Sequence, residues 1–393
     1  MDEKMSYTFQ HQILGQYFST QQASIRIDDL STQIINCRFD SCFPALVAPE
    51  RQQKWSSFDA ELMEAKLQVN DSFTYPIIFS GEKVKNDEAI LLLHGLNERS
   101  WSKYLVWAKY LSEQTGQPVI LFPLAFHMNR SPGTWNDPRV MSVVAAQRKS
   151  SFNDLKDSSY LNAALSVRLE NYPEQFILSG MQSYLDVVQF ALTLKEGRHP
   201  LFARNTRLNI FSYSIGAFLS ELLIMRNPLK LFDQTKLCLF CGGATFDRMN
   251  GSSRFIMDNR AFRRLNGLAT SGNFRRLRAY LRPLCLPELK SIWKTLWYMT
   301  FLKEGQQERN EVLNKIGSRI FAIGLARDRV FPPEDILATL KNPQKDIPTR
   351  VEIIDFPYSY THEIPFPMGN ERIYDQVDAS FRLVFDKVAG FLR

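Results

Sequence analysis

Short, continuous apolar runs recur along the chain and constrain its fold more than any other feature. They are AILLL at 89–93, VILF at 119–122, LNIF at 208–211, KLCLF at 236–240, IFAIGL at 320–325 and VEII at 351–354. Most of them lack the alternation of apolar and polar residues that marks a half-exposed strand. Strands that are apolar on both sides are typical of a parallel sheet covered by helices on both faces. The runs therefore predict such a sheet.

Helical patterns lie between these runs. In 101–115, Tyr104, Trp107, Ala108 and Leu111 have the i, i+3, i+4, i+7 spacing of one helix face, and Gly116 follows as a stop signal. The same spacing recurs in 182–196 and near the C-terminus. Strands that alternate with helices predict an α/β fold with a doubly wound, mostly parallel sheet.

The lengths of the connections predict the domain organisation. We divide the chain into an N-terminal extension (1–70), a core formed by 71–241 and 319–393 with an insertion at 125–206, and a helical cap at 242–318. Connections as long as these insertions usually carry function or form a subdomain. Residues 1–70 lack the strand–helix rhythm, so we expect an extension packed on the core or a small separate domain.

Composition and cysteine usage exclude several classes of protein. The net charge of +7 has no lysine-rich arm or RNA-binding motif beside it, so no nucleic-acid partner is expected. No run reaches the ~18 apolar residues of a membrane span, and the N-terminus lacks the pattern of a secretory signal. The CxxC spacing in CLFC (238–241) has no second pair beside it, which favours buried free thiols in a reducing cytoplasm over a metal site.

The segment SYSIG at 212–216 follows the run LNIF and precedes a helix-like stretch, AFLSELLIM. A sharp turn from strand to helix raises one side chain, here Ser214, above the edge of the sheet and directs the free N–H groups of the helix to the same point. Such a turn needs small residues on either side; Gly216 meets this requirement, and Ser212 meets it less ideally. Because serine is also a favoured helix N-cap, the motif alone does not decide its role.

Three further polar segments follow predicted strands. His94-Gly95 comes after the run at 89–93, Asp328 after 320–325, and His362, in YTHE, after 351–354. The carboxyl ends of parallel strands meet at one edge of a sheet, where α/β proteins bind ligands. In addition, the backbone N–H groups of Leu96 or Asn97 and of Ile215 are expected to face Ser214 and stabilise an oxyanion.

Together, HGLN, SYSIG, ARDRVFPP and YTHE resemble the α/β-hydrolase superfamily over about residues 75–393. The resemblance implies that Ser214 is the nucleophile and that His362 is the general base and later the general acid. It also implies that Asp328 orients the imidazole and stabilises its cation. Ser212 departs from the family's pattern, which has glycine at this position.

Other residues compete for roles in this site. Asp247, in GGATFDRMN, is an alternative to Asp328, which we favour because RDRVFPP continues into a helix start. His94 is expected to hydrogen-bond loop backbone, and Glu363 to lie at the surface beside His362. The candidate pocket residues are Asn97, Tyr213 and His127.

The segment 248–282 contains nine arginines and one acid, Asp258. The simpler interpretation is the solvated face of a cap helix. The functional one is a basic rim that attracts an anionic substrate, because guanidinium groups bind carboxylate and phosphate in a bidentate way.

The sequence thus predicts a serine hydrolase that acts through an acyl-enzyme on a small-molecule ester or acyl substrate, or less readily on an amide. An anionic substrate is one of the options. No metal and no organic cofactor is needed for this chemistry. Two alternatives stay open: a non-catalytic ligand-binding module on the same fold, and an acyltransferase that uses the same three residues.

Overall fold

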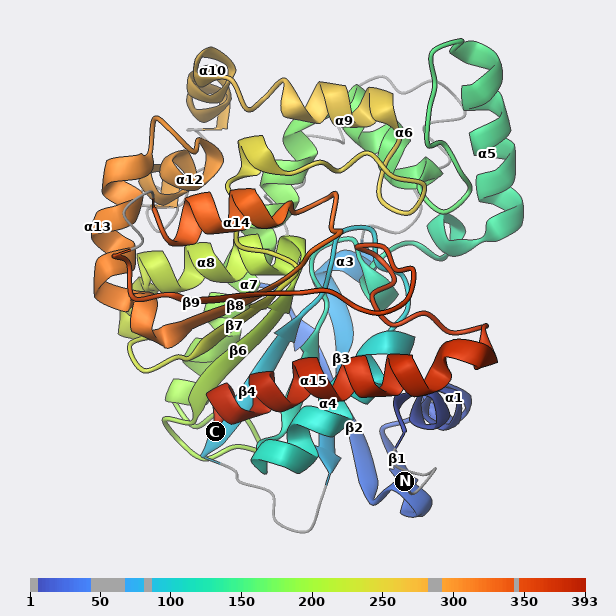
Figure 1. Ribbon diagram of the computed structural model, residues 1–393, viewed down its shortest axis with the longest axis vertical. Helices are drawn as coiled ribbons and strands as arrows, with labels where there is room; N and C mark the ends of the chain where they lie inside the picture. The colour runs from blue at the N-terminus through green and yellow to red at the C-terminus, as the bar shows by residue number, and fades with distance from the viewer. Residues whose placement is uncertain (1–5, 44–67, 81–86, 282–291, 343–345) are drawn as a thin grey trace.

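The computed structural model describes residues 6–43, 68–80, 87–281, 292–342 and 346–393. In these ranges nine strands form one sheet in the order β1-β2-β3-β5-β4-β6-β7-β8-β9 (Figure 1). The strands are β1 (Ser24–Ile27), β2 (Thr32–Asp40), β3 (Ser72–Ser80), β4 (Glu88–Leu93), β5 (Val119–Phe122), β6 (Arg207–Tyr213), β7 (Leu237–Phe240), β8 (Ile320–Leu325) and β9 (Arg350–Ile354).

The six strands from β5 to β9 in the sheet order pair in parallel. Each of the six apolar runs of the sequence is one of these strands. In register, Leu93 lies opposite Phe122 on one side and Ser212 on the other, so the carboxyl ends of β4, β5 and β6 meet at one edge. The mostly parallel sheet with helices between its strands confirms the predicted α/β-hydrolase fold class.

The N-terminal part of the chain adds strands to this sheet. β1 and β2 form an antiparallel hairpin, and β2 pairs with β3 along its whole length. β1 and β2 were not predicted, because an antiparallel hairpin has no helix between its strands and so lacks the strand–helix rhythm. Helix α1 (Tyr7–Tyr17) then packs on the C-terminal helix, where the N–H of Thr8 donates to the Asp378 carboxylate at 2.9 Å. The short helix α3 (Gln68–Asp71) leads into β3.

Helices cover both faces of the sheet, which explains why its strands are apolar on both sides. On one face, Leu92 packs in a cluster with Trp107 of α4 and Phe385 of α15. On the other, Leu91 packs with Tyr184 of α7 and Leu223 of α8. Figure 1 shows α15 and α4 on one side of the strands and α8 and α14 on the other. These helices are α4 (Ser102–Thr115), α15 (Tyr374–Leu392), α7 (Glu174–Lys195), α8 (Ile215–Arg226) and α14 (Pro333–Leu340).

The two long insertions meet above the carboxyl edge of the sheet (Figure 1). They contribute α5 (Pro138–Ser151), α6 (Ala163–Asn171), α9 (Asn259–Asn266), α10 (Ser271–Leu281), α12 (Ile292–Thr300) and α13 (Gln306–Ile316). Arg148 of α5 joins them through ion pairs with Asp258, at 2.5 Å, and Glu170 of α6, at 2.7 Å. None of the helices in the described ranges is long and apolar enough to cross a membrane.

Candidate active site

Ser214 stands at the sharp turn between β6 and α8. Its backbone has φ 58° and ψ −123°, a conformation that residues with a side chain rarely adopt and that costs on the order of 1–3 kcal/mol. The surroundings hold this conformation, because the N–H of Ser214 donates to the carbonyl of Phe240 on β7 at 3.2 Å, and its own carbonyl accepts from the N–H of Ala217 at 2.9 Å. Strain of this kind points the side chain out of the turn, as a nucleophile requires.

Gly216 and Ser212, the small residues on either side of Ser214, are small for different physical reasons. A Cβ atom at Gly216 would lie 2.6 Å from the carbonyl oxygen of Leu93 and 2.7 Å from that of His94, so α8 can approach β4 only with glycine here. Ser212 is fully buried, and its hydroxyl lies 2.8 Å from the hydroxyl of Ser220 on α8. The hydroxyl of Ser212, which stands where the family's pattern has glycine, therefore has a hydrogen-bond partner on the helix that follows the turn.

Ser214, His362 and Asp328 form one hydrogen-bonded chain. His362 Nε2 lies 2.7 Å from Ser214 Oγ, and His362 Nδ1 lies 2.8 Å from Asp328 Oδ2. The other carboxylate oxygen of Asp328 accepts the N–H groups of Val330 and Phe331 at 2.8 and 3.0 Å. With Nδ1 donating to the carboxylate, Nε2 is left to accept the hydroxyl proton of Ser214, which is the geometry of general-base activation.

Two aromatic rings enclose the imidazole of His362. Tyr213 stacks on it with an interplanar angle of 15° and Phe331 with 19°, at centroid distances of 5.4 and 5.5 Å. The Tyr213 hydroxyl also donates to the backbone carbonyl of His362. Tyr213, predicted as a pocket residue, thus lies beside the imidazole and lines none of the cavities described below. The stacking by Phe331 was not predicted, although its place three residues after Asp328 is a usable signal.

The alternative acid, Asp247, lies in a different environment. Its carboxylate accepts the hydroxyl of Thr245 at 2.7 Å and the N–H of Leu302 at 3.2 Å, which ties the turn after β7 to the end of α12. The carboxylate that the structure brings to His362 is that of Asp328.

Cys241 is buried against the same acid. Burial and the neighbouring Asp328 carboxylate raise the pKa of its thiol well above the ordinary value. Cys241, Asp328 and His362 are also the one group among the described residues that is close enough to hold a metal ion. Both ring nitrogens of His362 are already engaged with Asp328 and Ser214, so a metal would have to break that chain. Cys238, the other half of the CxxC spacing, is not in this group.

The backbone N–H groups of Leu96 and Ile215 are the predicted oxyanion donors. Neither donates to a backbone or side-chain acceptor within the described ranges, and both residues line the cavity that contains Ser214. Ile215 is the first residue of α8, where N–H groups are free and the helix dipole favours negative charge.

The loop that carries Leu96 is held by polar contacts. The His94 ring bonds the carbonyl of Gly95 at 2.8 Å and accepts the N–H of Leu124 at 3.0 Å, so it links the ends of β4 and β5. Burial lowers the pKa of His94 well below its usual value, which keeps the ring neutral. The Asn97 amide donates to the carbonyls of Leu161 and Phe255 at 2.7 and 2.6 Å, and so joins this loop to both insertions.

Two apolar cavities lie beside Ser214 and share Leu96, Phe176 and Ile215 in their walls. The first contains Ser214 itself and is closed by residues of the second insertion and of the β8–α14 turn. The second extends along α7 and α8, and His127, a predicted pocket residue, stands in its wall. Their walls are formed mostly by aliphatic and aromatic side chains, which suits an acyl chain or another apolar group.

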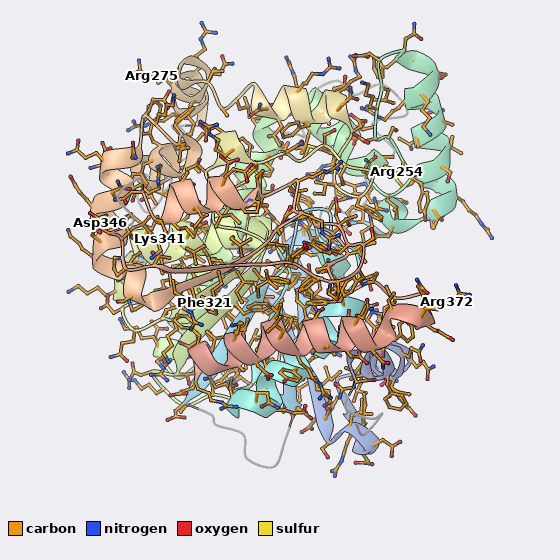
Figure 2. All side chains as sticks on the ribbon, viewed as in Figure 1. Arg254, Arg275, Phe321, Lys341, Asp346 and Arg372 are labelled. Carbon is orange, nitrogen blue, oxygen red and sulfur yellow. The ribbon has the colours of Figure 1, made fainter. Side chains whose placement is uncertain are left out.

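Apolar residues of the arginine-rich segment 248–282 line the cavity that contains Ser214, but the described arginines of this segment line neither of the two cavities. Arg260 pairs with Asp154 at 3.0 Å and Glu170 at 2.9 Å, and Arg263 also pairs with Asp154. Figure 2 shows Arg275 at the outer end of α10, far from the carboxyl edge of the sheet. Arg282 and Cys285 lie outside the described residues.

Several solved structures of esterases are similar to this chain. The chain is similar to a carboxyl esterase from the fungus Tuber melanosporum, with 14% identity, 82% of each chain covered and a TM-score of 0.42. It is also similar to esterases from Pyrobaculum calidifontis (9% identity, 98% of this chain and 88% of that chain, TM-score 0.47) and Pseudomonas putida (9%, 100% and 93%, 0.47). No curated protein matches the sequence.

One family model matches nearly the whole chain. It describes a family of unknown function (DUF6051), and the match runs over residues 5–393. The match includes the turn at Ser214, the loop at Leu96 and the segments that carry Asp328 and His362. The chain therefore belongs to this family, DUF6051, and has the α/β-hydrolase fold.

Proposed function

We propose that this protein is a serine hydrolase that cleaves a carboxylic ester through an acyl-enzyme. The observation that carries the proposal is the hydrogen-bonded chain from Ser214 through His362 to Asp328, with Ser214 on a strained turn at the start of α8. The fold alone would not support it, because α/β folds host many unrelated functions.

In the first half of the reaction, Ser214 Oγ attacks the ester carbonyl while His362 Nε2 takes its proton. The Asp328 carboxylate stabilises the imidazolium, and the N–H groups of Leu96 and Ile215 bind the oxyanion. Collapse of the tetrahedral intermediate breaks the bond to the leaving alcohol, which receives the proton from His362. In the second half, a water molecule gives a proton to His362 and attacks the acyl-enzyme carbonyl. Collapse of this second tetrahedral intermediate breaks the bond to Ser214 Oγ, which receives the proton back from His362, and the acid is released.

The surroundings support an ester with an apolar part. The cavities beside Ser214 are mostly apolar, and we propose that the insertion 242–318 caps them while the insertion 125–206 forms another wall. We retain the division into N-terminal extension, core and cap as part of the proposal. A cytoplasmic location also belongs to it, supported by the free thiols of Cys37, Cys42, Cys238 and Cys241.

The test is steady-state hydrolysis of a series of 4-nitrophenyl esters by matched variants. We expect Ser214→Ala to lower kcat by a factor that approaches ~10⁶ and Asp328→Asn by about 10⁴. Asp247→Asn is the control for the second replacement, since its carboxylate bonds Thr245 and Leu302 and does not contact His362. If Asp247→Asn were as damaging as Asp328→Asn, or if Ser214→Ala kept its activity, the proposal would be wrong.

A further inference from the structure

Lys103, the second residue of α4, contacts two loops of the candidate active site. Its ammonium pairs with the Glu98 carboxylate in the β4–α4 loop and donates to the backbone carbonyl of Glu363 at 3.0 Å. Glu98 lies two residues after Leu96. Glu363 directly follows His362. One cation therefore joins the loop of a proposed oxyanion donor to the loop of the proposed base.

The Tyr104 hydroxyl extends the contact with Glu98 to the backbone of Gly95. This hydroxyl donates to the Glu98 carboxylate at 2.9 Å and accepts the N–H of Gly95 at 3.1 Å. Tyr104 is fully buried, so bulk water does not compete for these two bonds. Gly95 directly precedes Leu96, whose N–H is the proposed donor. The carboxylate that Lys103 neutralises is thus one hydroxyl away from the backbone of that donor.

The ring of Tyr213 forms a second link between Lys103 and the proposed base. The Lys103 ammonium lies 4.6 Å from the centroid of this ring, within the range of a cation–π contact. The same ring stacks on the imidazole of His362, and its hydroxyl donates to the His362 carbonyl. A Cβ atom at Gly95 would lie 3.1 Å from the ring. The Tyr213 ring therefore contacts the cation, the imidazole and the loop of the oxyanion donor.

The peptide that follows His362 is held at two points. The carbonyl of Glu363 accepts the Lys103 ammonium, and its carboxylate accepts the hydroxyl of Ser253 from the insertion 242–318. The loop of the proposed base is therefore fixed both from α4 and from the insertion.

Burial makes the pair of Lys103 and Glu98 more important than a surface pair. The two side chains are 18% and 20% exposed, so their attraction is only weakly screened by salt. Without the cation, a mostly buried carboxylate would lose its charged partner and would gain by turning towards water. Such a movement would release the Tyr104 hydroxyl and, with it, the N–H of Gly95.

We propose that Lys103 is a positioning residue for the reaction at Ser214, because it fixes the Leu96 N–H relative to the imidazole of His362. The inference rests on the proposed function and deepens it. The oxyanion donor and the base lie on separate loops, and a reaction centre needs its groups aligned to within about 0.5 Å. The Lys103 ammonium takes no part in proton transfer.

The first experiment measures the hydrolysis of 4-nitrophenyl butyrate by Lys103→Met. We expect kcat and kcat/KM to fall together by ~10–100-fold, because a displacement of about 1 Å at a reaction centre can cost about 100-fold in rate. KM should change by less than about threefold, since a lost alignment acts on the transition state and not on substrate binding. A rise in KM with an unchanged kcat would overturn the proposal.

Lys109→Met is the matched control. Lys109 lies on the same helix and pairs with Glu113, and the two side chains are 1% and 18% exposed. The loss of its charge should cost at least as much stability in chemical denaturation as the loss of Lys103, but it should leave kcat unchanged. If Lys109→Met slowed hydrolysis as much as Lys103→Met, the effect would be one of stability and the proposal would be wrong.

A double-mutant cycle tests whether the contacts act as one network. Tyr104→Phe removes the hydroxyl between Glu98 and Gly95. If Lys103 acts through this hydroxyl, the combination of Lys103→Met and Tyr104→Phe should be little slower than the slower single variant. Losses that multiply in the double variant would show two independent effects and would contradict the proposal.

Hydrogen exchange tests the link between the loops without turnover. Lys103→Met should raise the exchange of backbone amides in the peptides that carry Gly95 and His362, whereas Lys109→Met should leave both peptides unchanged. Unchanged exchange in Lys103→Met would overturn the proposal. Raised exchange at both loops in a protein that hydrolyses no ester would reject the hydrolase and retain the link between the loops.

Discussion

The imidazole of His362 is held by four neighbours. Its two nitrogens hydrogen-bond Asp328 and Ser214, the rings of Tyr213 and Phe331 stack on it, and the backbone carbonyl of His362 accepts the Tyr213 hydroxyl. A ring fixed in this way keeps one orientation and one tautomer, so little reorganisation is needed when it takes a proton. The surroundings of His362 therefore suit the proposed role, in which the ring takes and returns a proton at one fixed position.

A second histidine, His199, links acidity to stability. The ring is buried, its Nδ1 accepts the N–H of Leu201 at 3.2 Å, and its Nε2 lies 2.8 Å from the Tyr75 hydroxyl. Burial lowers the pKa of His199 to about 4 in the folded state. In the unfolded chain the ring takes up a proton below its ordinary pKa of about 6.5, so stability is lost as the pH falls from about 6.5 towards 4.

Between pH 7 and 5, we therefore expect the free energy of unfolding to fall in the wild type by about 1–2 kcal/mol more than in His199→Gln. Urea unfolding at a series of pH values measures this difference, since all other titrating groups are common to both proteins. Parallel pH profiles would show that His199 does not contribute.

At the residue scale, chain order and strand context led us to expect Ser214, Asp328 and His362 at one edge of the sheet, and the structure brings them into one hydrogen-bonded chain. The roles of these residues remain part of the proposal. The stacking of Tyr213 on His362 and the thiol of Cys241 beside Asp328 could not be predicted in the same way, because both depend on contacts between segments distant in the sequence. Phe331, by contrast, lies three residues after Asp328, and this spacing could have identified it.

Among the elements, the turn between β6 and α8 carries Ser214, the proposed nucleophile, and Ile215, a proposed oxyanion donor. It stores backbone strain at Ser214 and brings the free N–H groups at the start of α8 to the same point. Gly216 allows α8 to approach β4, and the pair of Ser212 and Ser220 ties the strand to the helix. These contacts explain why the turn keeps its shape despite the cost of the strained conformation.

A buried ion network is one of the contacts that join the two insertions. Asp258 is fully buried, caps α9 through the N–H groups of Arg260 and Ala261, and pairs with Arg148 of the other insertion. We expect Arg148→Met to lower the free energy of unfolding by about 3–5 kcal/mol, because it leaves a buried carboxylate without its cation. Chemical denaturation measures the loss.

Arg263→Met is the control for the Arg148→Met replacement. Its side chain is 61% exposed in its pair with Asp154, and exposed pairs contribute at most about 1 kcal/mol. Losses of similar size in the two variants would show that the buried network does not join the insertions.

Strands were easier to predict than their connections. The six runs that became parallel strands are buried on both faces, and this environment leaves a continuous apolar signature in the sequence. The hairpin β1–β2 was missed because no helix separates its two strands, so it lacks the strand–helix rhythm on which the prediction of the sheet depended. The helices of the insertions were predicted only as helical segments, since their packing depends on partners such as Asp258 that sequence spacing does not identify.

Taken as a whole molecule, the protein places two apolar cavities on the same edge of the sheet as Ser214. Ser214, Asp328 and His362 follow three strands of the sheet, and residues of the two insertions contribute to the cavity walls. Under the proposed function, this arrangement combines a fixed reaction centre with walls that set the substrate, as expected where loops on a rigid scaffold carry specificity.

Labelling with a fluorophosphonate tests the central claim most directly, because this reagent forms a covalent bond only with an activated serine. We predict that the folded wild type takes up one label, that peptide mass spectrometry places it on Ser214, and that neither Ser214→Ala nor the heat-unfolded wild type reacts. A wild type that takes no label, or a Ser214→Ala variant that is labelled as well as the wild type, would contradict the account.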